Sequence, residues 1–372
     1  MFDEHYNSEN VIGGAEINLY NLAICFSRMQ DIETKVLVDD FGQPALLEKC
    51  NVRLIRYGST KKRGLAGKVA AVLARNLQLF LLEADAFIFT TSHPLLGKLV
   101  LFQKLLRGKK VIFRLSSDLN TDLESYRKKN SLLSYLYYRF GLMHSSAIVS
   151  QTEKQKKMLE ERLGLESIVI PNGFFIRRDW ERIEKRHILW VGRCMKSKRP
   201  LLFIQLARQF PREKFVMIMP VNKEIPAHEF KERKSLAGEI TSEAKELSNL
   251  KVLDYVAFSD IQNYFDCAKL YVCTSELEGF PNTFIQACLG GTPILSYNID
   301  PDGMIEKYGL GCFCRDDMKK AAAFISRLDE SLLSEYRDRT LEYVSKYNNI
   351  YETAERYLCV MDKKYNMPKP KL

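Results

Sequence analysis

Residues 275–293 contain the residue types in this chain that are best suited to hold a phosphate. They follow an apolar run, residues 270–274, that is typical of a buried strand, and an acidic turn with glycine leads on to a helix. We expect this helix to begin near Asn282 and Thr283, and its first backbone N–H groups, which have no partner inside the helix, could bind a phosphate. Glu278 lies just ahead of the helix and would sit beside whatever group the phosphate carries.

Two basic residues from another part of the chain could complete this phosphate site. Arg193 and Lys198 follow the apolar run at residues 187–191, which is also typical of a strand. The guanidinium offers a fixed fork of donors to phosphate oxygens, and the ammonium offers a mobile charge. Both would lie beyond the carboxyl end of a strand, where α/β sheets hold ligands. The alternative is that these side chains only solvate a loop, but the carboxylate downstream favours the site.

The elements that must position these residues are short apolar runs that alternate with helical patterns, which is typical of parallel sheets covered by helices. A polar stretch after residue 173 separates two such series, so the sequence predicts an α/β protein with two doubly wound domains. We place an N-terminal domain at residues 1–173, a C-terminal domain at 174–345, and a helix and tail at 346–372 that could pack back on the N-terminal domain. The expected strands lie at residues 35–38, 86–89, 110–113, 147–149, 168–170, 187–191, 215–219, 251–253, 270–273 and 294–295.

The N-terminal domain lacks the strand with which a doubly wound domain normally opens. The glycine turn at Gly13 and Gly14 follows a polar stretch, residues 4–10, that has no strand pattern. We therefore expect the first strand to be missing or truncated. We hypothesise an in-frame extension of about ten mostly apolar residues ahead of Met1, to match the usual length of a strand.

Composition excludes several classes of protein. Apolar residues make up 46% and charged residues 27% of the chain, as in soluble globular proteins, and no apolar run is long enough to span a bilayer. The nine cysteines form no CxxC pair, which favours reduced thiols over a disulfide framework or a zinc site. These features predict a cytoplasmic protein.

The net charge of +10 indicates a partner of negative charge. Basic clusters at residues 61–63, 107–110, 127–129 and 154–157 all lie in the first half of the chain. Together with the wide apolar face of residues 65–82, they favour peripheral contact with an anionic membrane, on its inner face. A solvated surface is the alternative. Nucleic acid is disfavoured because no nucleic-acid module is present and aromatic residues are not interleaved with the basic clusters.

Taken in order, four motifs resemble glycosyltransferase family 4, whose members are retaining enzymes with the GT-B fold of two facing Rossmann-like domains. The turn at Gly13 is similar to the N-terminal glycine loop of the family, and the loop with Arg193 and Lys198 resembles its phosphate clamp. The segment that begins at Glu278 resembles its E-x7-E element. The resemblance covers nearly the whole chain, is weakest over residues 40–146, and is carried by residues 13–16, 149–153 with 170–173, 191–198 and 278–286.

The resemblance implies an enzyme whose substrate is a nucleoside diphosphate sugar and that needs no metal or other cofactor. It assigns catalytic roles to Arg193, Lys198 and Glu278, with the two cations on the diphosphate and the carboxylate on sugar hydroxyls. The donor-binding residues would be Gly13, Gly14, Gly279, Phe280, Pro281, Asn282, Thr283 and Gln286.

Position 286 departs from the pattern of the family, which has a second glutamate there for the ribose diol. Gln286 could still bind a diol through its oxygen and its NH2 group, because an amide is both acceptor and donor. The loss of a charge-assisted hydrogen bond would weaken binding by about 1–2 kcal/mol. The alternative is that Gln286 only fills a face of the helix.

Candidates for the acceptor side come from the N-terminal domain. His93, Ser116 and Asp118 follow expected strands and would therefore lie at the ligand-binding edge of the sheet, although a histidine before a proline is also a common turn residue.

Asp300 and Asp302 resemble the D-x-D metal motif of the other glycosyltransferase architecture. Aspartates around a proline and before a glycine are ordinary in turns, so we favour a turn and expect no metal.

We therefore expect a glycosyltransferase of hexosyltransferase type. It would move a sugar from a nucleoside diphosphate sugar to a glycan or lipid-linked acceptor, in the biosynthesis of surface polysaccharides or glycoconjugates. Two alternatives stay open: a nucleotide-sugar epimerase of GT-B fold, and a non-catalytic GT-B binding partner of an active transferase. Gln286 and the missing first strand favour the second of these.

Overall fold

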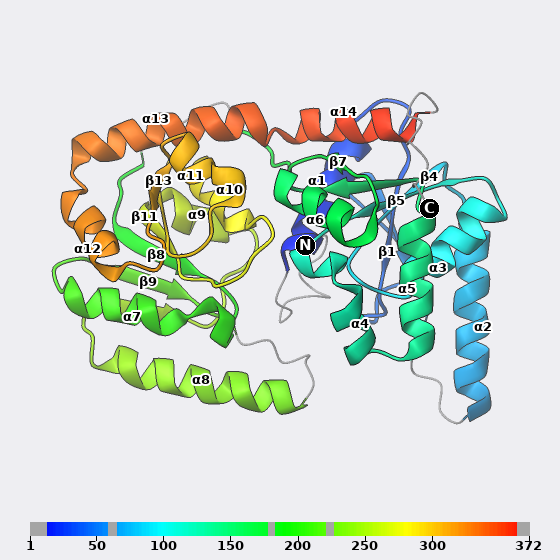
Figure 1. Ribbon diagram of the computed structural model, residues 1–372, viewed down its shortest axis with the longest axis horizontal. Coiled ribbons are helices and arrows are strands. Elements are labelled where there is room, and N and C mark those ends of the chain that lie inside the picture. Colours follow the sequence, from blue (N-terminus) through cyan, green and yellow to red (C-terminus); the bar gives the residue numbers. More distant parts are fainter. Residues whose placement is uncertain (1–12, 59–64, 178–182, 221–226, 363–372) are drawn as a thin grey trace. The chain divides into compact units, whose positions relative to one another are not determined.

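The computed structural model describes residues 13–58, 65–177, 183–220 and 227–362 of the chain (Figure 1). These residues form two compact units: an N-terminal unit of residues 14–173 with 350–362, and a C-terminal unit of residues 174–349, with which Gly13 is grouped. Each unit contains parallel strands connected by helices. The α/β class that the sequence predicts is therefore confirmed.

The described residues of the N-terminal unit contain two sheets. One has the order β1-β3-β2, with β1 parallel and β2 antiparallel to β3; the other is parallel throughout and has the order β4-β5-β6-β7. The strands are β1 (Thr34–Val38), β2 (Leu46–Lys49), β3 (Val52–Arg56), β4 (Ala86–Thr90), β5 (Lys110–Arg114), β6 (Ala147–Ser150) and β7 (Ile168–Val169). The helices are α1 (Gly14–Ser27), α2 (Leu65–Leu81), α3 (Leu95–Leu99), η2 (Val100–Leu105), η3 (Asp118–Thr121), α4 (Leu123–Lys129), α5 (Leu132–His144), α6 (Glu153–Leu163) and α14 (Ile350–Met361).

The sheet of the N-terminal unit is interrupted at its centre. A doubly wound sheet normally has its opening strand there, but the described chain begins with α1 and has no strand before it. Among the described residues, β1 pairs with β3 and β4 with β5, and no ladder joins β1 to β4. Leu37 of β1 and Phe87 and Phe89 of β4 nevertheless pack against one buried cluster. The described residues thus contain no strand ahead of α1; residues 1–12 and the hypothesised extension lie outside the described residues.

Three strands, β2, β3 and β13 (Gly311–Phe313), are absent from the sequence prediction. Charged residues interrupt the apolar pattern in β2, where Glu48 and Lys49 are exposed. In β3 two arginines interrupt the apolar residues, and Val52 is buried while Arg53 is exposed. Such short mixed runs give a weak signal for a strand, and here pairing with a neighbour decides the conformation.

The described residues of the C-terminal unit form one parallel sheet of six strands in the order β10-β9-β8-β11-β12-β13. The strand order reverses direction between β8 and β11. Besides β13, the strands are β8 (His187–Val191), β9 (Phe215–Ile218), β10 (Leu250–Leu253), β11 (Ala268–Cys273) and β12 (Ile294–Ser296). The helices are η4 (Lys196–Lys198), α7 (Pro200–Gln209), α8 (Ala227–Lys245), α9 (Ile261–Asp266), α10 (Asn282–Leu289), η5 (Pro301–Gly303), α11 (Met304–Lys307), α12 (Met318–Arg327) and α13 (Glu330–Tyr347).

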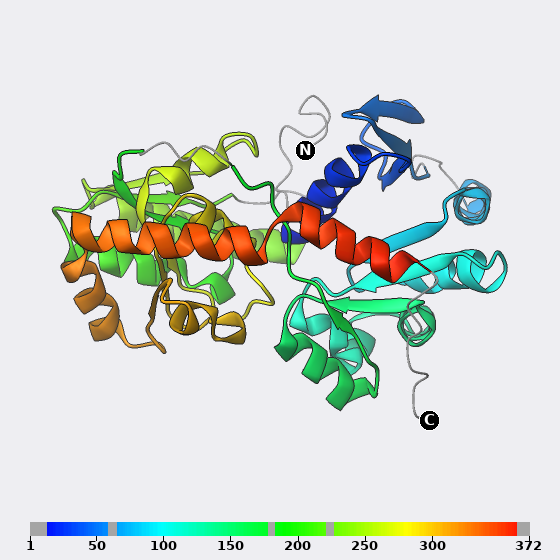
Figure 2. The same ribbon diagram turned by 90° about the horizontal axis from the view of Figure 1, so that it is seen from above.

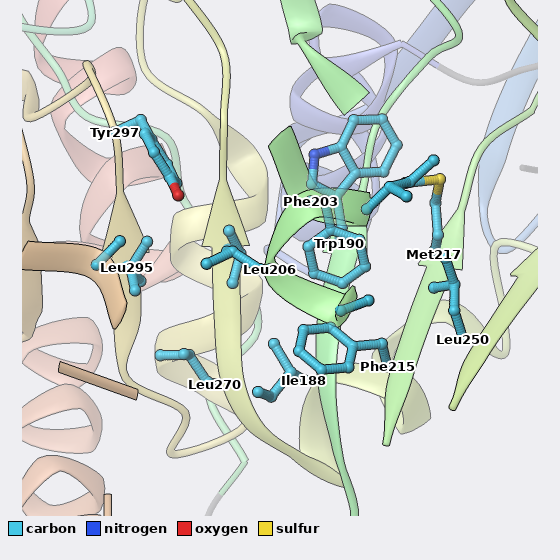
Figure 3. Close-up of a cluster of buried hydrophobic side chains, with 14 of the residues drawn as sticks. Ile188, Trp190, Phe203, Leu206, Phe215, Met217, Leu250, Leu270, Leu295 and Tyr297 are labelled. Atoms are coloured by element: carbon cyan, nitrogen blue, oxygen red, sulfur yellow. The ribbon is translucent and has the colours of Figure 1, made fainter. Parts of the chain in front are cut away.

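Both faces of this sheet are buried by helices. Ile188 and Trp190 of β8 belong to one buried cluster with Phe203 of α7 (Figure 3). On the opposite face, Tyr271 of β11 packs against Phe284 of α10, with ring centroids 6.2 Å apart. Because successive residues of a strand point to opposite faces, a strand covered on both sides must be mostly apolar, as β8 and β11 are, with His187 and Lys269 at or near their starts.

Helix α14 belongs to the N-terminal unit, where it packs against α1 (Figure 2). The Cys25 thiol donates to the Ile350 carbonyl at 3.8 Å, and the Asn21 side chain donates to the Gly173 carbonyl at 3.1 Å. A Cβ on Gly173 would lie 2.8 Å from Cα of Ile350, so the close approach of the two chain segments requires glycine. The ordered helix ends at Met361, and residues 363–372 lie outside the described residues.

A glycine at the edge strand of the C-terminal sheet provides a test of this packing. Gly311 has φ +151°, and a Cβ there would lie 1.9 Å from the carbonyl oxygen of Ile294 on β12. We expect Gly311→Ala to lower the free energy of unfolding of the C-terminal unit by about 2–4 kcal/mol, because the methyl group must displace backbone.

The matched control is Gly238→Ala in α8, where nothing lies within 4 Å of the new Cβ. We expect it to raise the free energy of unfolding by up to about 1 kcal/mol, since alanine favours a helix over glycine. Urea unfolding followed by tryptophan fluorescence measures both variants. Equal stabilities for the two would contradict the described β12–β13 contact.

Candidate active site

The carboxyl ends of β8 and β11 bring the two predicted motifs to one edge of the sheet. The strands are parallel neighbours, so the loops that follow Val191 and Cys273 leave the sheet together. The Glu276 N–H donates to the Ser197 carbonyl at 2.9 Å and ties one loop to the other. The strand order reverses between β8 and β11, and this is where open α/β sheets bind ligands.

Lys198 and Glu278 form an ion pair between these two loops. Their side chains are 18% and 21% exposed, so protein shields the pair on most sides. The Glu278 carboxylate also accepts a hydrogen bond from the Ser275 hydroxyl at 2.9 Å. Two residues with predicted catalytic roles are therefore in contact, although they lie 80 positions apart in the chain.

Arg199 holds the loop that presents Lys198. Its backbone is left-handed, with φ +46°, and its guanidinium donates to the Thr274 carbonyl at 2.7 Å and to Asp316 at 2.6 Å. The indole N–H of Trp190 donates to the Thr274 hydroxyl at 2.9 Å, and this hydroxyl donates to the Lys198 carbonyl. Sequence reasoning missed this network, because its members are far apart and each residue type is common in loops.

The first turn of α10 lies just beyond Glu278. The helix begins at Asn282, as predicted, and its N-cap is Pro281, whose side chain has no group that could accept a hydrogen bond from the helix. The Tyr271 hydroxyl donates to the Thr283 hydroxyl oxygen at 2.8 Å and so holds this turn on the sheet. Burial raises the pKa of Tyr271 well above its ordinary value, so the phenol keeps its proton at neutral pH.

The other predicted donor-binding residues differ in exposure. Gly279 and Phe280 form a half-buried turn ahead of α10. Gln286, on the second turn of this helix, is 6% exposed, which suits packing as well as contact with a ligand. Gly13 and Gly14 lie at the start of α1, where Gly14 is exposed. Their role in donor binding stays a prediction.

Arg193 is exposed in the loop after β8. Its neighbour Lys196 pairs with Glu232 at 2.9 Å, and Lys198 pairs with Glu278. Within the described part of the chain, Arg193 has no such carboxylate partner. Its guanidinium therefore keeps its donors for a ligand, which is what the predicted phosphate contact requires.

In the described ranges, no group of three or more His, Cys, Asp or Glu side chains is arranged to hold a metal ion. The Asp300 carboxylate accepts a hydrogen bond from the Ile305 N–H at 2.7 Å and so caps α11. Asp302 has φ +51° in the short turn η5. These two aspartates thus have the turn geometry that the sequence favoured over a metal motif.

His93 lies after β4 in the N-terminal unit, with an exposed side chain. Its Nδ1 accepts a hydrogen bond from the Leu95 N–H at 3.1 Å. Partial desolvation, followed by the positive charges of Arg75 and Lys98, lowers the pKa of His93 below its ordinary value. The ring is therefore neutral at neutral pH, and its proton lies on Nε2 because Nδ1 is the acceptor.

The other two acceptor-side candidates make contacts within the fold. The Ser116 hydroxyl donates to Asn120 at 3.2 Å. Asp118 is 5% exposed, and its carboxylate accepts hydrogen bonds from Lys154 at 2.8 Å and Gln155 at 3.1 Å. This carboxylate holds α6 against η3, so His93 is the better placed of the three to meet a ligand.

Comparison with known proteins finds a family match in the C-terminal unit. Residues 185–331 match the family described as glycosyl transferases group 1. A protein of Haemophilus influenzae, named an uncharacterized glycosyltransferase, is 25% identical over 184 residues, which is 46% of this chain and 47% of that protein. The match thus spans about half the length of this relative. The family segment contains Arg193, Lys198, Glu278 and Gln286.

Solved structures resemble the chain over almost its full length. A sucrose-phosphate synthase from Thermosynechococcus elongatus has a TM-score of 0.72 at 15% identity and matches 94% of this chain and 93% of its own. HepE from Anabaena, solved with UDP-glucose, has a TM-score of 0.67 at 15% identity and matches 94% and 97%. At these identities the likeness shows the fold, and the chain has the GT-B fold that its motifs predict.

The Lys198–Glu278 pair can be tested by a double-mutant cycle. Removing either partner leaves a partly buried charge uncompensated, so we expect Lys198→Met and Glu278→Gln each to lower the free energy of unfolding by about 1–2 kcal/mol. We expect a coupling energy of about 1 kcal/mol from urea unfolding. The control is the exposed pair Glu335–Arg339 in α13, with a coupling of about 0.3–0.5 kcal/mol. Equal couplings in the two cycles would argue against a shielded pair.

Proposed function

We propose that the protein is a retaining, metal-independent glycosyltransferase that moves a hexose from a nucleoside diphosphate sugar to a glycan or lipid-linked acceptor. The observation that carries this proposal is the contact of Lys198 with Glu278 at the switch point of the C-terminal sheet, inside the segment that matches glycosyl transferases group 1. A cation for phosphate and a carboxylate for hydroxyls are what a nucleotide-sugar donor needs side by side.

The diphosphate of the donor would lie against Arg193, Lys198 and the first turn of α10. The exposed guanidinium can bind two oxygens at once, and the backbone N–H groups of the helix start add donors and a positive dipole end. Binding would move Lys198 from Glu278 to a phosphate oxygen, which leaves the Glu278 carboxylate free to accept hydrogen bonds from the sugar. The ion pair thus holds both groups in place before the donor arrives.

Transfer with retention would proceed on one face of the sugar. The bond between C1 and the diphosphate oxygen breaks, the acceptor oxygen bonds to C1 from the same face, and the acceptor proton passes to the departing phosphate. The two cations stabilise the charge that grows on the leaving diphosphate. With this positive charge in place, the chain would need no metal ion for the step.

Two further points of the proposal concern substrates. HepE was solved with UDP-glucose, so UDP-glucose is the first donor to test here. The acceptor would be an intermediate of a surface polysaccharide or glycoconjugate.

Substitution of the three residues with proposed catalytic roles tests the function. We expect Arg193→Ala, Lys198→Ala and Glu278→Ala each to reduce transfer by about a hundredfold or more, since each removes a group that acts on the leaving diphosphate or the sugar. Lys196→Ala, in the same loop but paired with Glu232 on the surface, is the control and should retain activity within about twofold. Release of nucleoside diphosphate from UDP- and GDP-sugars, with and without a chelator, measures activity, and circular dichroism checks folding.

The outcomes separate the proposal from its alternatives. Undiminished turnover in a folded Arg193→Ala or Glu278→Ala variant would contradict the site, and loss of activity with chelator would contradict metal independence. Conversion of a nucleotide sugar in water alone would indicate an epimerase. If no nucleoside diphosphate raises the melting temperature, the result would favour a non-catalytic binding partner, because a ligand bound by the folded state must stabilise it.

We also propose peripheral contact of the N-terminal unit with an anionic membrane. No described helix is long and apolar enough to cross a bilayer. Instead, Val72, Leu73 and Leu77 of α2 are 53–63% exposed, and Leu132 and Leu133 of α5 are 61–65% exposed. Several exposed apolar side chains on one helix are typical of surfaces that meet a protein or a membrane.

Basic residues beside the α5 leucines favour an anionic bilayer as the partner. Arg127 and Lys129 at the end of α4 and Arg139 on α5 are exposed. Apolar side chains that enter the headgroup region, flanked by cations, are the pattern of peripheral membrane proteins. The basic residues 61–63, which the sequence placed beside α2, lie outside the described residues.

Binding to vesicles tests this surface. We expect Leu73→Ser with Leu133→Ser to lower the affinity for phosphatidylglycerol-containing vesicles by about tenfold, since each leucine would lose its burial in lipid. Leu46→Ser, at a residue of β2 that is 58% exposed, is the control and should bind as the wild type does. Sedimentation with vesicles measures the bound fraction, and equal loss in the control, or no loss in the double variant, would contradict the proposal.

A further inference from the structure

Polar side chains with no role in donor binding gather at the carboxyl edge of the N-terminal sheets. Asp39 follows β1, Tyr57 follows β3, and His93 lies three residues beyond β4. The Tyr57 N–H donates to the Val38 carbonyl at 2.7 Å, which places the ends of β1 and β3 side by side, and the charge of Asp39 acts on both Tyr57 and His93. In α/β structures this edge is the one at which ligands bind.

Arg75 of α2 reaches this edge and lies over the Tyr57 ring, 4.5 Å from its centroid. Gly58 makes room for it, because a Cβ there would lie 2.6 Å from Cγ of Arg75. Gly58 also has φ +69°, a conformation that favours glycine. The backbone and the aromatic ring thus hold the stem of Arg75 in one place. Its guanidinium also interacts with the Tyr57 hydroxyl, and because a guanidinium has five N–H donors, others are left for a ligand.

Lys98 of α3 brings a second cation to the same place. Its ammonium donates to the Asn76 side chain at 3.0 Å and lies 5.9 Å from the ring centroid of Tyr137. Because Asn76 follows Arg75 on α2, this bond brings the two cations near each other. Burial, and then the charge of Arg75, lowers the pKa of Lys98.

In the described residues, neither Arg75 nor Lys98 forms an ion pair with a carboxylate. Asp39 is the acid whose charge reaches this group of residues, and its side chain is exposed. Two like charges held together without paired carboxylates are a destabilising arrangement unless an anion joins them. The neutral ring of His93 adds an Nε2–H donor beside them.

The backbone between β4 and His93 is strained. Thr91 has φ +76°, which is a rare conformation for a β-branched residue. The next residue, Ser92, is held by Tyr138 at 3.1 Å and by Asn120 at 2.7 Å. Strain of this kind persists where surrounding contacts fix it, and it is typical of ligand-binding loops.

We propose that Arg75, Lys98 and His93 form a subsite for a phosphate group carried by the acceptor. The guanidinium and the ammonium would bind phosphate oxygens, and His93 would donate to a third from Nε2. This inference rests on the proposed transferase function, to which it adds the substrate class: an acceptor that bears a phosphate monoester. The phosphate could belong to a soluble sugar phosphate or to a lipid headgroup, which share this chemistry.

The experiment measures phosphate binding while the donor site is blocked. With UDP in excess, calorimetry is carried out with glucose 6-phosphate, with glucose, and with short-chain phosphatidic acid. We expect binding of one or both phosphate compounds and no binding of glucose. Preference for glucose 6-phosphate indicates a soluble acceptor, and preference for phosphatidic acid indicates a lipid one. Failure of both phosphate compounds to bind would overturn the subsite.

A crossed pair of variants separates this subsite from the donor site. Lys98→Met should weaken phosphate binding at least tenfold and leave UDP binding unchanged, whereas Lys198→Met should weaken UDP binding and leave phosphate binding unchanged. Lys98→Arg should restore most of the affinity because it restores the charge. The surface variant Lys109→Met, whose partner is Asp85 at 3.3 Å, is the control.

These measurements test the phosphate subsite and the donor site separately, so either proposal can be contradicted without the other. If phosphate binds equally to wild type and to a folded Lys98→Met variant, the subsite is wrong even where UDP binding is intact. If UDP does not bind, the proposed donor site is wrong, and the phosphate titrations are then read without UDP.

Discussion

Two opposite charges, on Lys198 and Glu278, are held together where only about a fifth of each side chain meets water. In such surroundings the attraction is stronger than at a fully wet surface, and the loss of either partner is more costly. The loops after β8 and β11 must therefore keep their positions relative to each other. The bonds from Arg199 to Thr274 and Asp316 fix the first loop, and the helix start beside the second is fixed to the sheet by Tyr271. The geometry of the C-terminal unit depends on this constraint.

The sequence could predict those parts of the candidate site that lie in continuous motifs, but not the contacts between residues that are far apart in the chain. Each motif is continuous in sequence, so Arg193, Lys198 and Glu278 could be proposed as candidates from residue type and from their place after apolar runs, and the contact of Lys198 with Glu278 is what the structure adds. The start of α10 at Asn282 was predictable for the same reason, because a turn and a proline precede it. The network that orients Lys198 was not predictable, since it joins residues 75 and 117 positions apart through ordinary loop side chains.

The N-terminal unit was less predictable, for a different physical reason. Its strands β2 and β3 mix charged with apolar residues, and their conformation depends on pairing that a sequence pattern does not reveal. Arg75 and Lys98 lie on two helices, so their approach follows from tertiary packing alone. The sequence predicts a missing or truncated first strand because polar residues precede Gly14, but residues 1–12 lie outside the described residues, so this stays a prediction. Among the described residues no ladder joins β1 to β4, and apolar side chains of both strands pack against one buried cluster.

The charge balance at the proposed donor site bears on Gln286. A diphosphate brings at least two negative charges. The proposed site would oppose them with the charges of Arg193 and Lys198 and with the positive end of α10, which is equivalent to about half a charge. Glu278 already offsets one cation in the absence of ligand. A glutamate at position 286, with 6% of the residue exposed, would add a desolvated negative charge to the helix whose first turn we propose binds the diphosphate. A neutral amide removes that repulsion while it keeps both an acceptor and a donor for a diol. The weaker repulsion therefore offsets part of the binding free energy that is lost with the charge-assisted hydrogen bond. Glutamine at this position does not by itself argue against an active enzyme.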